Sequence, residues 1–365
     1  QRQMCIRDSA EMAESVRPAF LELAALIDRW MTVAGDDPGV SRFPDGEAYY
    51  AHILRSHCAV DISPSQAHEL GLAEVARIQD ELRQVFDKLG YAQDASIPER
   101  IARAAREGGG YNTSTQTGRD EALAAYQALL DEMDGKLDEM FDLRPAAELV
   151  IVGEPYGGGG YYVSAAKDGS RPGAFHAGVG GSHVPKFDMP SLVYHEALPG
   201  HHFQLALAQE MDSPAFRNDL SFNGYIEGWA LYAERLAWEM GLYDDDPYGN
   251  VGRLQFELLR AVRVVTDTGL HAMGWTREEA LAYMSETVGS RWSPEEYRYI
   301  AWPAMSVSYK IGMIQIMALR QAAMDELGDQ FDLKGFHRVV VGNGNVPLDV
   351  LERLVQAYIE AELED

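Results

Sequence analysis

Along most of the chain, apolar residues recur every three or four positions, which is the spacing that gives a helix one apolar face. The first such interval runs from Met12 to Thr32. A second helix is predicted to begin at Pro64 and to end before Gly90, because proline favours the first helical turn and glycine follows the last. A third interval, 121–141, repeats the pattern. The residues expected to face a core are Phe20, Leu21, Leu23, Leu26 and Ile27 in the first interval and Leu70, Leu72, Val75, Ile78, Leu82 and Val85 in the second.

Between Leu149 and Gly181 the helical spacing gives way to short β-rich segments. Strands are predicted over 149–152, 161–163 and 175–179, and the glycines of 157–160 predict a turn. The edge of such a sheet can pair with an extended peptide. A hairpin that only supports the fold is an equally good interpretation.

Helical spacing returns after Met189 and persists to the end, so the predicted fold class is mainly α with a small β-sheet. We divide the chain into an N-terminal helical part, 10–148, and a part that carries the candidate site, 149–365. Residues 1–9 fit neither a signal peptide nor a helix and are similar to a translated adapter sequence, so we exclude them and expect the natural N-terminus to be missing. The later helices are predicted over 191–209, 225–239, 251–273, 276–288, 293–302, 306–327 and 348–363.

Composition narrows the classes of function. The chain has 31 basic and 57 acidic residues, a formal net charge of −26, which disfavours binding to the phosphates of nucleic acids. No apolar run reaches the roughly 18 residues of a membrane span, so we expect a soluble protein, either cytoplasmic or exported. Because the chain has 2 cysteines, a cysteine-rich zinc site is excluded, and a metal would need histidine and carboxylate ligands.

The densest group of metal-capable side chains lies in the segment His195-Glu196-Ala197-Leu198-Pro199-Gly200-His201-His202. In a helix with the motif His-Glu-x-x-His, two histidines one turn apart bind zinc and the glutamate acts as general base. Proline at position 199 breaks this spacing. On an unbroken helix His202 would return to the face of His195, whereas a bulge at Pro199 would bring His201 there instead. We prefer His201 and keep His202 as the alternative.

A helix that the histidines merely cap or fill would be a simpler interpretation, but three histidines with Glu196 around a Pro-Gly break favour a metal site. The third ligand is predicted to be Glu227, because a carboxylate on a helix as apolar as this one is costly unless it is paired or bound to metal. Glu234 lies two turns further on the same face and is expected to orient a ligand. We therefore predict one Zn²⁺ per chain.

These segments resemble the bacterial domain-of-unknown-function family 885, with Glu227-Gly228-Trp229-Ala230 as the second motif. The resemblance runs from about Tyr49 to the end of the chain. The family is similar in layout to the carboxypeptidase Taq, thimet oligopeptidase and angiotensin-converting enzyme groups, which implies a helical zincin-like (gluzincin) peptidase fold. Further segments that carry it are His68-Glu69-Leu70-Gly71-Leu72, Asp267-Thr268-Gly269-Leu270-His271 and Tyr309-Lys310-Ile311-Gly312.

The resemblance also implies roles. The Gly-His of the carboxypeptidase Taq helix is similar to Gly200-His201, and Tyr309 is similar to the tyrosine that stabilises an oxyanion in those enzymes. His271 is expected to act similarly or to bind substrate, although a helix-capping histidine fits as well. Arginines on apolar helices are candidates for binding a substrate carboxylate, although surface ion pairs would also account for them; they are Arg260, Arg263 and Arg320.

We therefore expect a zinc-dependent peptidase that hydrolyses a peptide substrate with metal-activated water, with Glu196 as the general base. An amidohydrolase acting on a small non-peptide amide and a non-catalytic metal-binding protein are the alternatives. An intact glutamate at position 196 argues against the binding protein, because a metal scaffold alone needs no base there.

Overall fold

The computed structural model describes residues 9, 11–155, 159–214, 217 and 220–364, and it divides into two compact units, one up to Pro38 and one from Gly39. The boundary expected at residues 148/149 lies inside the second unit. Most of the residues predicted to be foreign, 1–9, lie outside the described ones. No helix in these ranges is both long and apolar enough to cross a membrane.

The first unit consists of a π-helical turn, Met12–Val16, followed by α2 (Arg17–Met31). The predicted helix is therefore present, but none of its residues is buried. The apolar face expected to meet a core is exposed, with 68% of Phe20 and 61% of Leu21 accessible. The reason is local: among the described residues, this unit has no second long element against which the face could pack.

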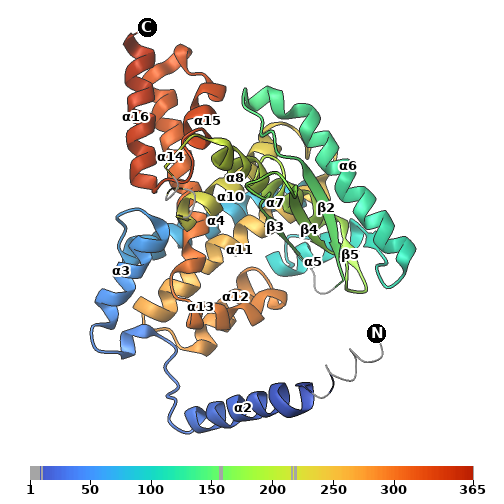
Figure 1. The fold of residues 1–365 in the computed structure, drawn as a ribbon, viewed down its shortest axis with the longest axis vertical. Coiled ribbons are helices and arrows are strands. Elements are labelled where there is room, and N and C mark those ends of the chain that lie inside the picture. Colours follow the sequence, from blue (N-terminus) through green and yellow to red (C-terminus); the bar gives the residue numbers. More distant parts are fainter. Residues whose placement is uncertain (1–8, 10, 156–158, 215–216, 218–219, 365) are drawn as a thin grey trace. The chain divides into compact units, whose positions relative to one another are not determined.

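The second unit is mainly helical, as predicted, with α11 (Pro247–Ala272) crossing its middle (Figure 1). Every residue of α11 from Val251 to His271 is buried, because α4 and several later elements pack around it. The remaining α-helices described here are α3 (Gly46–Cys58), α4 (Pro64–Lys88), α5 (Ile97–Glu107), α6 (Gln116–Met140), α7 (Met189–Glu196), α8 (His201–Glu210), α10 (Asn223–Glu239), α12 (Arg277–Thr287), α13 (Glu296–Ala301), α14 (Ser308–Leu327), α15 (Leu333–Val341) and α16 (Leu348–Glu364).

Helix α4 shows how local signals and packing combine. Its start at Pro64 is confirmed: the Ser63 side chain accepts a hydrogen bond from the Gln66 N–H, which completes a capping box. The predicted inward positions Leu70 and Leu72 are wrong, since 38% and 43% of these residues are exposed. Gly71 lies between them and meets α11 so closely that a Cβ there would be 2.8 Å from a methyl group of Val265. The two leucines therefore flank the contact and point outward.

The small sheet was also predicted correctly. Strand β4 (Gly173–Gly178) lies in its centre, parallel to β2 (Leu149–Glu154) and antiparallel to β3 (Gly160–Val163). A second antiparallel pair joins β1 (Gly110–Tyr111) to β5 (Val184–Pro185). The glycine turn expected over 157–160 falls largely outside the described residues. Strand β3 is an edge strand, so its outer hydrogen-bonding groups are not used by the three-stranded sheet.

Helices α10 and α14 make one of the most extensive helix contacts of this unit. Three glycines lie at this contact, Gly224 and Gly228 on α10 and Gly312 on α14. A Cβ on Gly228 would lie 2.5 Å from the carbonyl carbon of Gly312, and a Cβ on Gly312 would lie 1.8 Å from the carbonyl oxygen of Gly224. The two backbones are therefore in direct contact, which fixes the distance between Glu227 on one helix and Tyr309 on the other.

Candidate metal centre

The helix predicted over 191–209 is broken in two. Helix α7 ends at Glu196 and α8 begins at His201, since proline at position 199 has no N–H to donate to a continuous helix. Gly200 packs against the end of α7, where a Cβ would lie 1.9 Å from the carbonyl oxygen of His195. The Trp229 indole N–H donates to the carbonyl of Pro199 at 2.8 Å, which ties the turn to α10.

This break brings together His195, His201 and Glu227, whose ligand atoms all lie within 4.8 Å of one another. The Nε2 atoms of both histidines are 3.5 Å from Oε2 of Glu227. That oxygen is buried and, among the described residues, has no hydrogen-bond partner. Tetrahedral zinc with bonds of about 2.0–2.2 Å places its ligand atoms roughly 3.3 Å apart. The donor set and two of its spacings therefore fit a zinc ion.

The residue expected to orient a ligand lies where the prediction placed it. Oε1 of Glu234 accepts a hydrogen bond from Nδ1 of His195 at 2.8 Å, which leaves Nε2 of the same ring facing Glu227. Burial lowers the pKa of His195, but the neighbouring carboxylates of Glu227 and Glu234 outweigh burial and raise the pKa to about 9. A carboxylate behind a histidine is a common way to fix the ring of a metal ligand.

His202 points away from this cluster. Its Nδ1 lies 3.0 Å from the hydroxyl of Tyr162 on β3, and burial lowers the pKa of His202 to about 4. Of the two histidines left open by the sequence, His201 is the one that the structure brings to His195 and Glu227. The ring of His201 lies at 83° to that of His195, with 4.8 Å between centroids.

Tyr309 is also near the cluster. Its ring is nearly parallel to that of His195, with 6.5 Å between centroids. Burial raises the pKa of the Tyr309 phenol, and the negative charge of Glu227 raises it further. Conversely, burial opposes ionisation of Glu227, but the neighbouring His201 and His195 hold its pKa well below its usual range. The phenol therefore stays protonated and can donate a hydrogen bond.

These residues line a cavity of about 800 Å³. Glu196 is 8% exposed and forms part of its wall next to His195. Strand β3 contributes Tyr161 and Tyr162, so an edge of the sheet borders the cavity. Helix α11 contributes two arginines, Arg260 and Arg263. The cavity thus combines the candidate ligands, a carboxylate, a phenol and cationic side chains.

Two residues with predicted roles lie elsewhere. His271 is fully buried; its Nδ1 accepts from the Val40 N–H at 3.2 Å and its Nε2 faces the carbonyl of Tyr299 at 3.0 Å. It is not part of the cavity wall, and both ring nitrogens are used in the core, so its position is structural. Arg320 also lies outside the cavity wall and pairs with Glu239 at 2.7 Å, an ion pair of the kind kept as the alternative.

Sequence reasoning missed part of the cavity wall. Asp188 is 5% exposed and pairs with Arg291 at 2.9 Å, and Glu295 pairs with Arg263 at 2.8 Å. Three of these residues come from short 3₁₀ segments: Asp188 from Lys186–Asp188, and Arg291 and Glu295 from Ser290–Glu295. Such segments have no hydrophobic repeat, so the pattern along the chain contains no signal for them.

Solved structures share this fold. One described as a "putative lipoprotein" from Colwellia psychrerythraea is 38% identical, with a TM-score of 0.91, over 96% of this chain and 62% of that one. A "putative lipoprotein of unknown function" from Shewanella oneidensis is 18% identical, with a TM-score of 0.77, over 94% of this chain and 65% of that one, and shows the fold alone. This chain thus spans less than two thirds of either.

No curated protein matches the chain. The family model described as a bacterial protein of unknown function, DUF885, matches residues 1–355. The match covers nearly the whole chain, including both histidine-bearing helices and Glu227. The chain therefore belongs to the DUF885 family.

Proposed function

We propose that this chain is a zinc-dependent peptidase. The observation that carries the proposal is the convergence of His195, His201 and Glu227 beside Glu196 in one cavity. Two histidines and a carboxylate are a common ligand set of catalytic zinc, which keeps a fourth position for water. The fold is proposed to be zincin-like, a helical gluzincin arrangement in which the third ligand comes from α10.

His195, His201 and Glu227 would hold the ion, and Glu234 would keep the ring of His195 in place. When bound, zinc supplies a Lewis acid and lowers the pKa of a water ligand toward about 7. Glu196 lies directly after His195 and lines the same cavity, so its carboxylate would accept a proton from the attacking water and return it to the leaving amine. Tyr309 has a neutral phenol, which can donate a hydrogen bond to the oxyanion that develops during the reaction.

The shape of the site favours a peptide over a small amide. A cavity of about 800 Å³ holds several residues, and β3 offers an edge strand along its wall. An extended peptide can pair with such an edge through main-chain hydrogen bonds. Arg263 stacks over Tyr309, with 5.5 Å from its Cζ atom to the ring centroid, and contributes charge to the same wall. Because the 38%-identical structure is described as a putative lipoprotein, we propose that the activity lies outside the cytoplasm.

The test separates metal binding from chemistry. Purified chain should contain about one zinc, and His195→Ala or Glu227→Ala should lose most of it. Glu196→Gln should keep zinc and lose on the order of 10²–10⁴-fold in the rate of cleaving a mixed peptide library. Tyr309→Phe should keep zinc and lower kcat by roughly 10²–10³-fold.

Three results would contradict the proposal. Full zinc content in both ligand variants would show that His195 and Glu227 do not bind the metal. Equal activity in wild type and Glu196→Gln would leave a metal-binding protein without this mechanism. Cleavage of small amides but of no peptide would assign an amidohydrolase instead. Each variant should first match wild type in thermal unfolding, so that a loss of activity is not a loss of fold.

A further inference from the structure

One arginine in the cavity wall has few acceptors or carboxylates near its guanidinium group. Arg260 is 7% exposed and lines the cavity from α11. Its Nη1 donates to the carbonyl of Phe256 at 3.2 Å, and the nearest carboxylate paired with it is Glu234, at 3.7 Å from Nη2. Among the described residues its buried Nε has no hydrogen-bond partner. A buried cation with so few acceptors is costly unless a ligand completes them.

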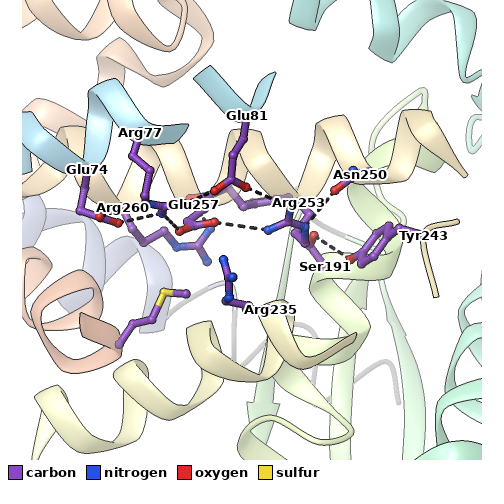
Figure 2. Close-up of polar contacts among 12 residues, drawn as sticks. Glu74, Arg77, Glu81, Ser191, Arg235, Tyr243, Asn250, Arg253, Glu257 and Arg260 are labelled. Atoms are coloured by element: carbon purple, nitrogen blue, oxygen red, sulfur yellow. Dashed lines mark hydrogen bonds and ion pairs between the residues drawn. The ribbon is translucent and has the colours of Figure 1, made fainter. Parts of the chain in front are cut away.

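The acidic residue one turn away cannot supply that acceptor. Figure 2 shows Glu257 at the centre of a buried ion network between α4 and α11. Its Oε1 accepts from Arg77 and, at 2.7 Å, from Lys310, while Arg253 approaches Oε2 at 3.3 Å. Three cations already surround this carboxylate. The negative charge of Glu257 is therefore already paired within the network and does not balance the charge of Arg260.

The other arginines of the cavity differ in this respect. Arg263 forms a two-pronged ion pair with Glu295, with distances of 2.8–3.0 Å. Arg291 pairs with Asp188 at 2.9 Å. Arg298 lies at the exposed end of the wall, where water solvates its charge. Arg260 thus combines burial, incomplete pairing and a place on the wall.

Arg260 is also close to the proposed reaction centre. Its Nη2 lies 3.7 Å from Oε1 of Glu234, which holds His195, and both Arg260 and Tyr309 line the cavity. An anion bound by Arg260 would therefore lie beside the metal ligands. Arg260 is 7% exposed within the wall that α11 forms, so an anion would reach it through the cavity.

We propose that Arg260 binds a carboxylate of the substrate. That the carboxylate belongs to a substrate rests on the proposed function. The anion site itself rests on the geometry of Arg260 alone. A guanidinium makes charge-assisted, often two-pronged hydrogen bonds with a carboxylate, and these are stronger than neutral ones. The carboxylate is either the C-terminal group, which makes the enzyme a carboxypeptidase, or the side chain of an acidic residue near the cleaved bond.

The first experiment measures binding without chemistry. Hippurate (N-benzoylglycine) and its neutral amide are titrated into the zinc-loaded chain and into the metal-free chain by calorimetry. We expect hippurate to bind at least about 10-fold more tightly than the amide in both, and Arg260→Gln to abolish that preference. Arg298→Gln removes the same charge from the exposed rim and should leave the ratio unchanged. Equal binding of acid and amide by wild type would overturn the proposal, and so would a preference that survives Arg260→Gln.

The second experiment distinguishes the two sources of the carboxylate. Three peptides of one length are compared as substrates: a free acid with neutral side chains, its C-terminal amide, and an amide with one Glu side chain. Cleavage of the free acid alone identifies the C-terminal carboxylate, and cleavage of the Glu-containing amide identifies the side chain. Equal cleavage of all three would overturn a role for Arg260 in substrate selection while leaving the peptidase intact.

The variants also tell the anion site from the peptidase. Arg260→Lys keeps the charge and should recover part of the preference for the acid, which a purely structural arginine would not do. Arg260-dependent hippurate binding without zinc or hydrolysis would keep the anion site and end the peptidase proposal. If Arg260→Gln unfolds, Arg260→Lys replaces it in the binding experiment, where a reduced preference for the acid supports the proposal and an unchanged preference overturns it.

Discussion

The contact between α10 and α14 predicts the effect of a single methyl group. In Gly312→Ala the new Cβ would lie 1.8 Å from the carbonyl oxygen of Gly224 and 2.9 Å from Cα of Gly228. A normal carbon–oxygen contact is about 3.3 Å, so the helices must separate locally by roughly 1.5 Å. Both neighbours are backbone atoms, so no side chain can rotate away.

Such overpacking costs about 1–3 kcal/mol, and the higher helix propensity of alanine returns less than about 1 kcal/mol. We therefore expect a net loss of about 1–2 kcal/mol in the free energy of unfolding, measured by urea titration. Gly135→Ala in α6 is the matched control, because a Cβ there meets nothing within 4 Å. The control should be as stable as wild type or slightly more stable.

The same variant should separate zinc binding from turnover. The proposed ligands lie on α7, α8 and α10, whereas Tyr309 lies on α14, so separating α14 from α10 moves Tyr309 relative to the ligands. Displacement of a catalytic group by about 1 Å costs on the order of 10²-fold in rate. Wild-type stability together with wild-type turnover in Gly312→Ala would refute the argument that the two backbones touch.

Three further predictions follow from other contacts. His201→Ala should abolish zinc binding and His202→Ala should retain it; metal analysis giving the reverse result would contradict the geometry. Burial raises the pKa of Asp267 to about 7 from 3.8, so its stabilising contribution is full below about pH 4 and is lost as pH rises through 7. The unfolding free energy of wild type should therefore fall by about 3 kcal/mol relative to Asp267→Asn between those pH values, and parallel profiles would contradict this. Lys310→Met should cost about 3–5 kcal/mol in urea unfolding, because its ammonium holds two carboxylates in the buried network, and a loss under 1 kcal/mol would show that the network does not depend on it.

Local rules predicted the elements whose signals lie within one segment. The start of α4 at Pro64, the strands around 149–179 and most later helices follow from capping, turns and spacing. Helix α5 was not predicted, although the sequence spacing of Ser96 and Glu99 is that of a capping box and indicates a helix start. Helices α3 and α15 were missed as well; α15 contains a run of valines that favours a strand, and only tertiary packing makes it helical.

The candidate site was predictable where its residues share a short segment. His195, Glu196 and His201 lie within one turn and its flanks, and Glu227 stood out as an acid on an apolar helix. The environments of His271 and Arg320 depend on partners far along the chain, such as Val40 for the histidine. The choice between His201 and His202 depends on the backbone path at Pro199, which spacing alone leaves open.

The burial of helix α11 predicts the order in which parts of the protein unfold. Every residue from Val251 to His271 is buried, and α4 and several later elements pack against this stretch. Its amide hydrogens can therefore exchange with heavy water only after the neighbouring elements have separated from it. We expect the slowest hydrogen exchange in the chain in this helix, at a rate that reports the free energy of global unfolding. The exposed helix α2, in which no residue is buried, should exchange through local fraying long before. A protease that needs an unfolded stretch would then cut near the start of the chain first and reach the α11 wall of the cavity last.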